Sequence, residues 1–204
     1  MEMFSTRLPG GEGLARSREC AVLSVVGRKV GDRLSVSRRE LTEQVTRRAV
    51  ATGLIMGLRG EALARLEGAA RIHRLGEVFL HGTFGDKCFD HLTPDERKTY
   101  RSYPIYSAMR VAESVSSPVY EMLLRHRELV HGDDLLKSGR VAAPLASRIL
   151  CAATEYEERV QFANGDLHEI ARIEADFAGD NGGRYDPRVV DALLGSITAE
   201  HVVH

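Results

Sequence analysis

The sequence predicts an all-α protein whose main part is a helical bundle. Apolar residues recur at steps of three and four along most of the chain, which is the spacing of one helix face. Three helix starts combine a capping residue with proline, at Thr93-Pro94, Ser117-Pro118 and Asp186-Pro187. The chain shows no strand meander, no alternation of strands and helices, and no internal repeat. With 204 residues, 43% of them hydrophobic, it can bury one substantial core.

The first 36 residues are expected to form an N-terminal arm or a small extension, and residues 37–204 the main domain. Residues 1–19 are rich in Gly, Arg and polar residues and include Pro9-Gly10-Gly11, so they predict an irregular arm. Residues 20–30 are β-branched enough for a short strand, although the opening of a helix also fits.

The main domain is predicted to open with two helices. The first begins near Ser37, and Gly57 and Gly60 fit its end; its apolar positions are Leu41, Val45, Ala49, Leu54, Ile55 and Leu58. The second covers residues 61–75, with apolar positions at Leu63, Leu66, Ala70 and Ile72.

Later helix starts follow from capping chemistry. Thr93-Pro94-Asp95-Glu96 predicts a capping box, because Glu96 can return a hydrogen bond to the backbone of the hydroxyl cap. Pro104 should kink this helix or begin a new one. Further helices are expected over residues 118–130, 144–160, 166–177 and 187–197, with a turn at 179–184.

Composition indicates a globular protein of the cytoplasm. The formal net charge of −1 lacks the basic excess typical of nucleic-acid binding, so the sequence argues against a nucleic-acid partner. The chain has no stretch of signal-peptide or membrane-spanning type, so we expect no membrane association. Cys20, Cys88 and Cys151 form no CxxC pair and no even disulfide framework, which favours a reducing compartment.

Charge is distributed unevenly along the chain. Residues 1–60 carry 11 Lys and Arg against 6 Asp and Glu, whereas residues 151–204 carry 4 against 11. A basic head and an acidic tail can attract each other within one fold or between two copies. A homodimer is therefore compatible with the sequence.

Candidate chemistry is confined to clusters of His and carboxylates, because the sequence has no phosphate loop, GxGxxG, HExxH or GxSxG motif. His73 and Glu77 are four residues apart, but such a pair is more often a surface hydrogen bond than a pair of metal ligands. The acidic run is best explained as a solvated helix face; its members are Glu155, Glu157 and Glu158. The remaining cluster consists of His126, Glu128, His131 and Asp133.

Taken in order, several segments resemble the HD-GYP family. HD-GYP proteins are helical bacterial phosphodiesterases of the HD superfamily that hydrolyse cyclic di-GMP, and the metal-free HDOD group is a related alternative. Order and spacing carry the resemblance over residues 37–195. The matching segments are residues 69–78, 92–96, Tyr103-Pro104, 124–128, Gly132, 144–150 and 185–190. The resemblance implies an HD-superfamily helical bundle.

The same resemblance implies a degenerate site. Only His73 and His126 stand at positions where the family has metal ligands, and the position near Leu41 has no His. The family's metal ligands and assisting lysine are substituted at Arg74, Glu77, Tyr103, Arg127 and Thr154. The Gly-Tyr-Pro signature is also absent from residues 131–136.

These substitutions favour a non-catalytic signalling or scaffold domain with no cofactor and no metal. Arg74 and Arg127 offer only hydrogen-bond donors and a fixed positive charge, which would repel a cation. They could fill the cavity, their charge offset by Glu77, Glu128 or Asp133. We expect action through a protein partner, and the resemblance makes a signalling protein such as a diguanylate cyclase one candidate.

Two alternatives remain open from the sequence. The first is a metal-dependent phosphohydrolase of cyclic di-GMP or another nucleotide, with a rearranged site built from His73, His126, Glu128, His131 and Asp133. The second is a nucleotide sensor in which Arg74 and Arg127 hold an anion without hydrolysing it.

Overall fold

The computed structural model describes residues 10–80, 87, 91–128 and 143–202. These residues form helices and contain no strand, which confirms the all-α prediction. The described α-helices, with one 3-10 helix (η1), are α1 (Gly10–Gly31), α2 (Val36–Ile55), α3 (Gly60–Ile72), η1 (His73–Phe79), α4 (Pro94–Tyr100), α5 (Tyr103–Val111), α6 (Ser117–Arg125), α8 (Leu145–Ala163), α9 (Leu167–Ala178) and α10 (Pro187–Val202).

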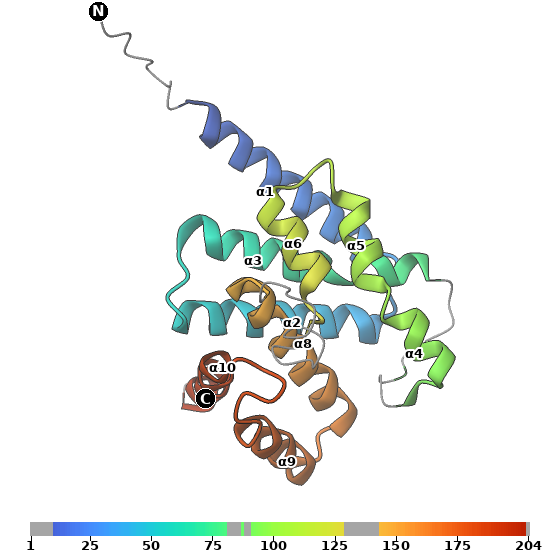
Figure 1. Ribbon diagram of the computed structural model, residues 1–204, viewed down its shortest axis with the longest axis vertical. Coiled ribbons are helices and arrows are strands. Elements are labelled where there is room, and N and C mark those ends of the chain that lie inside the picture. Colours follow the sequence, from blue (N-terminus) through green and yellow to red (C-terminus); the bar gives the residue numbers. More distant parts are fainter. Residues whose placement is uncertain (1–9, 81–86, 88–90, 129–142, 203–204) are drawn as a thin grey trace, which may run out of the picture.

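Helices α2 and α3 form the centre of the bundle (Figure 1). Helix α3 packs against α1, α2 and α6, while α2 also packs against α8 and α10. Helix α5 lies against η1 and α6, so it covers the side of the bundle opposite α9 and α10. The fully buried apolar side chains of the core include Leu41, Val45, Leu66, Ile72, Leu123, Ile149, Leu150 and Leu193.

The N-terminal segment is helical from Gly10, so the irregular arm predicted for residues 1–19 is wrong from Gly10 onward. Of the two alternatives for residues 20–30, the structure has the helix and not the strand. Leu23 and Val30 lie seven residues apart and are both buried. The Leu23 side chain packs so closely on α3 that a Cβ at Gly68 would lie 2.5 Å from its Cδ1 atom. This tertiary packing outweighs the strand propensity of residues 20–30. The division at residue 36 stays a prediction.

Most of the predicted helix starts are confirmed. The Thr93 hydroxyl accepts a hydrogen bond from the Glu96 N–H, and the Glu96 carboxylate accepts one from the Thr93 N–H, which completes the capping box. Pro104 belongs to a new helix, α5. The predicted cap at Ser117 is wrong by one residue: Ser116 precedes α6, and its N–H donates to Glu19 of α1 over 2.5 Å.

Two helix ends differ from the predicted bounds, and one agrees with them. Helix α3 stops at Ile72 and continues as η1, so the predicted helix over 61–75 changes type in its last turn. Helix α6 ends at Arg125, before the predicted 130. Gly57, with φ of +84°, closes the α2 end in the left-handed region, as its place in the sequence suggests. Within the described residues, none of the helices is both long enough and apolar enough to span a membrane.

The backbones of η1 and α5 approach each other closely at Gly76. A Cβ at Gly76 would lie 2.0 Å from the Tyr103 carbonyl oxygen and 2.9 Å from the Ser107 nitrogen. The Gly76 N–H donates to the Ser107 hydroxyl over 2.7 Å, and this hydroxyl donates to the His73 carbonyl over 2.7 Å. Because only glycine fits here, the contact fixes the place of α5 relative to His73.

Gly76→Ala is expected to lower the free energy of unfolding by about 1–3 kcal/mol, because α5 must move away from η1 to admit the methyl group. Urea denaturation followed by circular dichroism measures the change. Gly195→Ala is the matched control, since a Cβ at Gly195 meets nothing closer than 3.9 Å and the residue lies within α10. Equal stability of the two variants would contradict the prediction.

Candidate functional site

The two vestigial ligand positions meet in the interior of the bundle. His73 begins η1 and His126 directly follows α6; both are fully buried, with ring centroids 5.5 Å apart and planes almost perpendicular. His73 Nδ1 lies 2.6 Å from the Ala70 carbonyl oxygen, and His126 Nδ1 lies 2.8 Å from that of Leu123. Each Nδ1 therefore carries the proton, which leaves the two Nε2 atoms as acceptors.

Burial keeps both imidazoles neutral. Desolvation, together with the charge of Arg127, lowers the pKa of His126 to about 3. Desolvation, followed by the charges of Arg74 and His126, lowers the pKa of His73 well below 6.5. The Nε2 atom of His126 lies 2.8 Å from the Tyr103 hydroxyl, whereas His73 Nε2 has no hydrogen-bond partner among the described residues.

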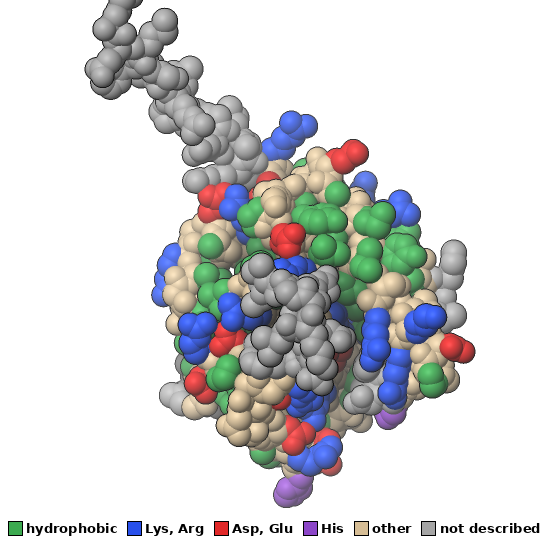
Figure 2. All heavy atoms as spheres, in the orientation of Figure 1, with side chains coloured by type: hydrophobic (Ala, Val, Ile, Leu, Met, Phe, Trp, Pro, Cys, Tyr) green, Lys and Arg blue, Asp and Glu red, His purple; other side chains and the backbone are tan. Residues whose placement is uncertain are grey.

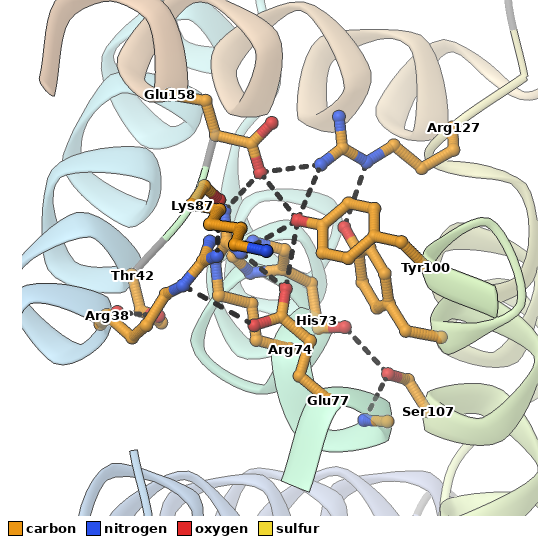
Figure 3. A network of polar contacts seen from close by, with 12 residues as sticks. Arg38, Thr42, His73, Arg74, Glu77, Lys87, Tyr100, Ser107, Arg127 and Glu158 are labelled. Carbon is orange, nitrogen blue, oxygen red and sulfur yellow. Dashed lines mark hydrogen bonds and ion pairs between the residues drawn. The ribbon is translucent and has the colours of Figure 1, made fainter. Parts of the chain in front are cut away.

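Arg74 lies beside His73 and faces Glu77 and Glu158 (Figure 3). Its guanidinium is fully buried; Nη1 donates to Glu77 over 2.5 Å and Nη2 donates to Glu158 over 2.5 Å. The Nη1 group also lies 3.2 Å from the Tyr100 hydroxyl. The expectation that Glu77 offsets the charge of Arg74 therefore agrees with the geometry.

Arg127 enters the same cluster from the end of α6. Its Nη2 donates to the Glu158 oxygen that Arg74 also contacts, over 2.6 Å, and its Nε donates to the Tyr103 hydroxyl over 2.9 Å. Its Nη1 forms an ion pair with Glu155. Glu158 thus connects the two arginines, which come from segments more than fifty residues apart in the chain.

Glu158 is the acidic centre of this cluster. Its side chain is 7% exposed, and burial alone would raise the pKa of its carboxyl group, but the charges of Arg127 and Arg74 hold that pKa far below its usual range. The prediction of a solvated face for the acidic run is therefore wrong for two of its members. Glu158 joins the cluster, and the buried Glu157 accepts from Arg48 over 2.8 Å.

Two tyrosines complete the network. The Tyr103 hydroxyl accepts from Arg127 and donates to His126, and its burial raises the pKa of the phenol. The Tyr100 hydroxyl lies 3.0 Å from Glu158 and 3.1 Å from Glu77. Tyr100 was not identified from the sequence. It ends α4, Tyr103 begins α5, and their ring centroids lie 5.0 Å apart.

Arg38 of α2 was also missed. Its side chain lies 3.9 Å from Glu77 and donates to the Lys87 carbonyl over 3.0 Å, so a third guanidinium borders the cluster. Arg38 lies three residues before Leu41 and seven before Val45, so the spacing places it on the buried face of α2; it was missed because a charged residue near a helix start is normally assigned to solvent. Arg38 is buried, with 6% of its surface exposed, and its guanidinium lies near the Glu77 carboxylate of η1.

The remaining candidates do not join the cluster. Glu128 pairs with Arg125 of its own segment, so it does not offset Arg74 or Arg127 as expected. Thr154 is buried on α8, and its hydroxyl donates to the Leu150 carbonyl. His131 and Asp133 lie outside the described residues. Among the described residues, no three His, Cys, Asp or Glu side chains converge as metal ligands would.

The arrangement of charges disfavours the binding of a cation and also that of an anion. A cation would have to enter beside two guanidinium groups, and an anion would have to displace Glu158 from both of them at once. Burial would lower the pKa of Arg74 and of Arg127, but for Arg74 chiefly Glu77 and for Arg127 chiefly Glu158 keep it well above its ordinary value. The arginines thus remain charged, and their charge is compensated by side chains of this chain.

Comparison with known proteins supports the fold. No family model matches the chain, and no curated protein matches it. Among solved structures, the chain is similar to Bd1817, an HD-GYP protein from Bdellovibrio bacteriovorus, with a TM-score of 0.65 and 14% sequence identity. The match covers 92% of this chain and 66% of the other, so this chain spans less than two thirds of that protein's length. The HD-GYP-like fold implied by the sequence resemblance is thereby confirmed.

Proposed function

We propose that this chain is a non-catalytic signalling or scaffold domain with an HD-GYP-like fold, which acts in the cytoplasm by binding another protein. One observation carries the proposal: Glu158 bridges Arg74 and Arg127 inside the bundle, where the resemblance would put a metal centre. Four of the five substituted positions join this cluster, namely Arg74, Glu77, Tyr103 and Arg127, whereas Thr154 lies outside it.

Hydrolysis of a phosphodiester in such a fold depends on a metal that activates water. Each metal ligand must supply a lone pair, and a guanidinium group has none to give. His126 Nε2 already accepts from Tyr103, which leaves His73 Nε2 as the one histidine lone pair without a partner in the described cluster. A single nitrogen cannot hold a divalent ion against two neighbouring positive charges.

The buried ion cluster also gives the domain a fixed interior. Arg74 joins η1 to α8 through Glu158, and Arg127 joins the end of α6 to the same carboxylate. Such a network supports a rigid scaffold whose surface, rather than its interior, is available for contact. A protein partner, for which a diguanylate cyclase is one candidate, fits a domain with this property.

The protein is expected to show no hydrolysis of cyclic di-GMP and no stoichiometric metal. The purified chain is assayed with added Mn²⁺ or Fe²⁺, and its metal content is measured by mass spectrometry. His73→Ala and His126→Ala should give the same background signal as wild type, and His168→Ala, which replaces an exposed residue, is the control.

Two results would overturn the proposal. One is stoichiometric metal together with turnover that His73→Ala or His126→Ala removes and His168→Ala preserves. The other is a rise of the melting temperature with cyclic di-GMP or a guanine nucleotide that is lost when Arg74 or Arg127 is replaced. This second result would identify a nucleotide sensor instead.

A further inference from the structure

Helix α5 carries an exposed apolar patch. Ile105, Tyr106 and Met109 form this α5 patch and are 48%, 43% and 64% exposed. They occupy positions i, i+1 and i+4, so they lie on one side of the helix. The opposite side is buried in the bundle, and its members are Tyr103, Ser107, Ala108 and Val111. The α5 patch is therefore the outer face of a helix whose inner face packs against the bundle.

Charged side chains lie near both ends of the helix. Arg101 is exposed just before α5 and Glu113 just after it, while the exposed Arg110 belongs to its last turn. Figure 2 shows hydrophobic side chains gathered over α5 and α6, with Lys and Arg side chains beside them. Arg101 and Glu113 each lie six positions from residue 107, so a rotation of 180° at that level brings each beside the opposite charge of a second copy.

We propose that the α5 patch is the interface of a homodimer in which two copies of α5 pack antiparallel about a two-fold axis. The two-fold axis crosses the outer face of α5 at the level of residue 107. Ile105 of each copy then faces Met109 of the other, and the two Tyr106 rings lie near the axis. The same register places Arg101 of each copy beside Glu113 of the other. Both apolar and charged groups are then paired by a single arrangement.

The bundle holds α5 ready for such a contact. Its inner face is fixed by the Gly76 contact with Tyr103 and Ser107, and Arg110 lies over the Phe79 ring with its guanidinium carbon 4.1 Å from the ring centroid. A preformed helix loses little conformational freedom on binding, which favours association. The dimer does not depend on whether the buried cluster is catalytic, so it can be tested separately from the proposed function.

The interface is expected to be small. Three partly exposed side chains form only the centre of a surface, whereas a standard interface buries about 800 Å² per partner. A weak, reversible dimer follows, with a dissociation constant on the order of micromolar rather than nanomolar. Tyrosine and methionine are enriched in the centres of such interfaces, which is where this register puts Tyr106 and Met109.

Sedimentation velocity of the whole chain tests the proposal, at concentrations on the order of 1 to 200 µM that bracket the affinity of a small interface. The wild type should shift from monomer to dimer as its concentration rises. Met109→Glu should weaken the dimer at least about tenfold, because it places two carboxylates near the axis. Leu167→Glu is the matched control, since Leu167 is 78% exposed on α9, and it should dimerise like the wild type.

A charge exchange tests the register. Arg101→Glu and Glu113→Arg should each weaken the dimer, and the double variant should restore it, because opposite charges then face each other again. Circular dichroism must show that every variant keeps the wild-type helix content. A wild type that stays monomeric throughout, equal loss with Leu167→Glu, or no restoration in the double variant would overturn the proposed interface.

Discussion

Glu158→Gln is expected to lower the free energy of unfolding by about 3–5 kcal/mol, the range found when one partner of a buried ion pair is removed. The substitution preserves volume but removes the charge that two arginines share at 2.5 and 2.6 Å. Arg74 has no exposed side-chain surface, so water cannot replace the missing carboxylate there. The amide would also place N–H donors beside guanidinium donors.

Urea denaturation at pH 7.5 measures this loss, and a melting temperature lower by about 10 °C is expected for a chain of this length. Glu169→Gln is the control: it removes a carboxylate of the same kind from the surface pair with Arg172 on α9, and its melting temperature should stay at the wild-type value. If both variants melted together near the wild-type temperature, the buried cluster would have no special role in stability.

The fold was largely predictable because its signals are local. The capping box at Thr93 and the proline that begins α5 depend on residues within one turn of each other, and both are present. Helix α1 was left undecided because its evidence is not local. Residues 20–30 suit a strand as well as a helix, and tertiary packing such as that of Leu23 on Gly68 decides between them.

The candidate site was predictable only in part. The resemblance to the HD-GYP family placed His73 and His126 at ligand positions of one site, and their rings do meet. The Arg74–Glu77 pair was predictable because the two residues lie within one helical turn. Glu158 was assigned to a solvated face because a run of acidic residues normally lies on the solvent-exposed side of a helix. Its distance from Thr154 held a signal: a residue four positions later lies on the same helix face, which is the face that the resemblance turns toward the metal centre.

The two buried histidines are expected to make stability fall as the pH falls below 6.5. In the folded chain the pKa of His126 is lowered to about 3 and that of His73 lies well below its ordinary value of 6.5, so both stay neutral. The unfolded chain binds protons on both rings below pH 6.5 and is stabilised by them. Each histidine should therefore lower the free energy of unfolding by about 2 kcal/mol at pH 5 relative to pH 7.5, and the two together by about 4 kcal/mol.

Melting curves between pH 7.5 and 5 isolate this effect, since carboxyl groups with an unfolded pKa of 4.5, such as that of Glu158, remain ionised in both states over most of the range. His73→Asn keeps a donor near the Ala70 carbonyl but cannot be protonated. The change in melting temperature between pH 7.5 and 5 should therefore fall by about half in this variant. His168→Asn, at an exposed position of α9, should keep the full dependence. A wild-type melting temperature that does not change from pH 7.5 to 5 would mean that His73 and His126 bind protons inside the folded chain. That result would contradict the arrangement in which the charged Arg74 and Arg127 lie beside them.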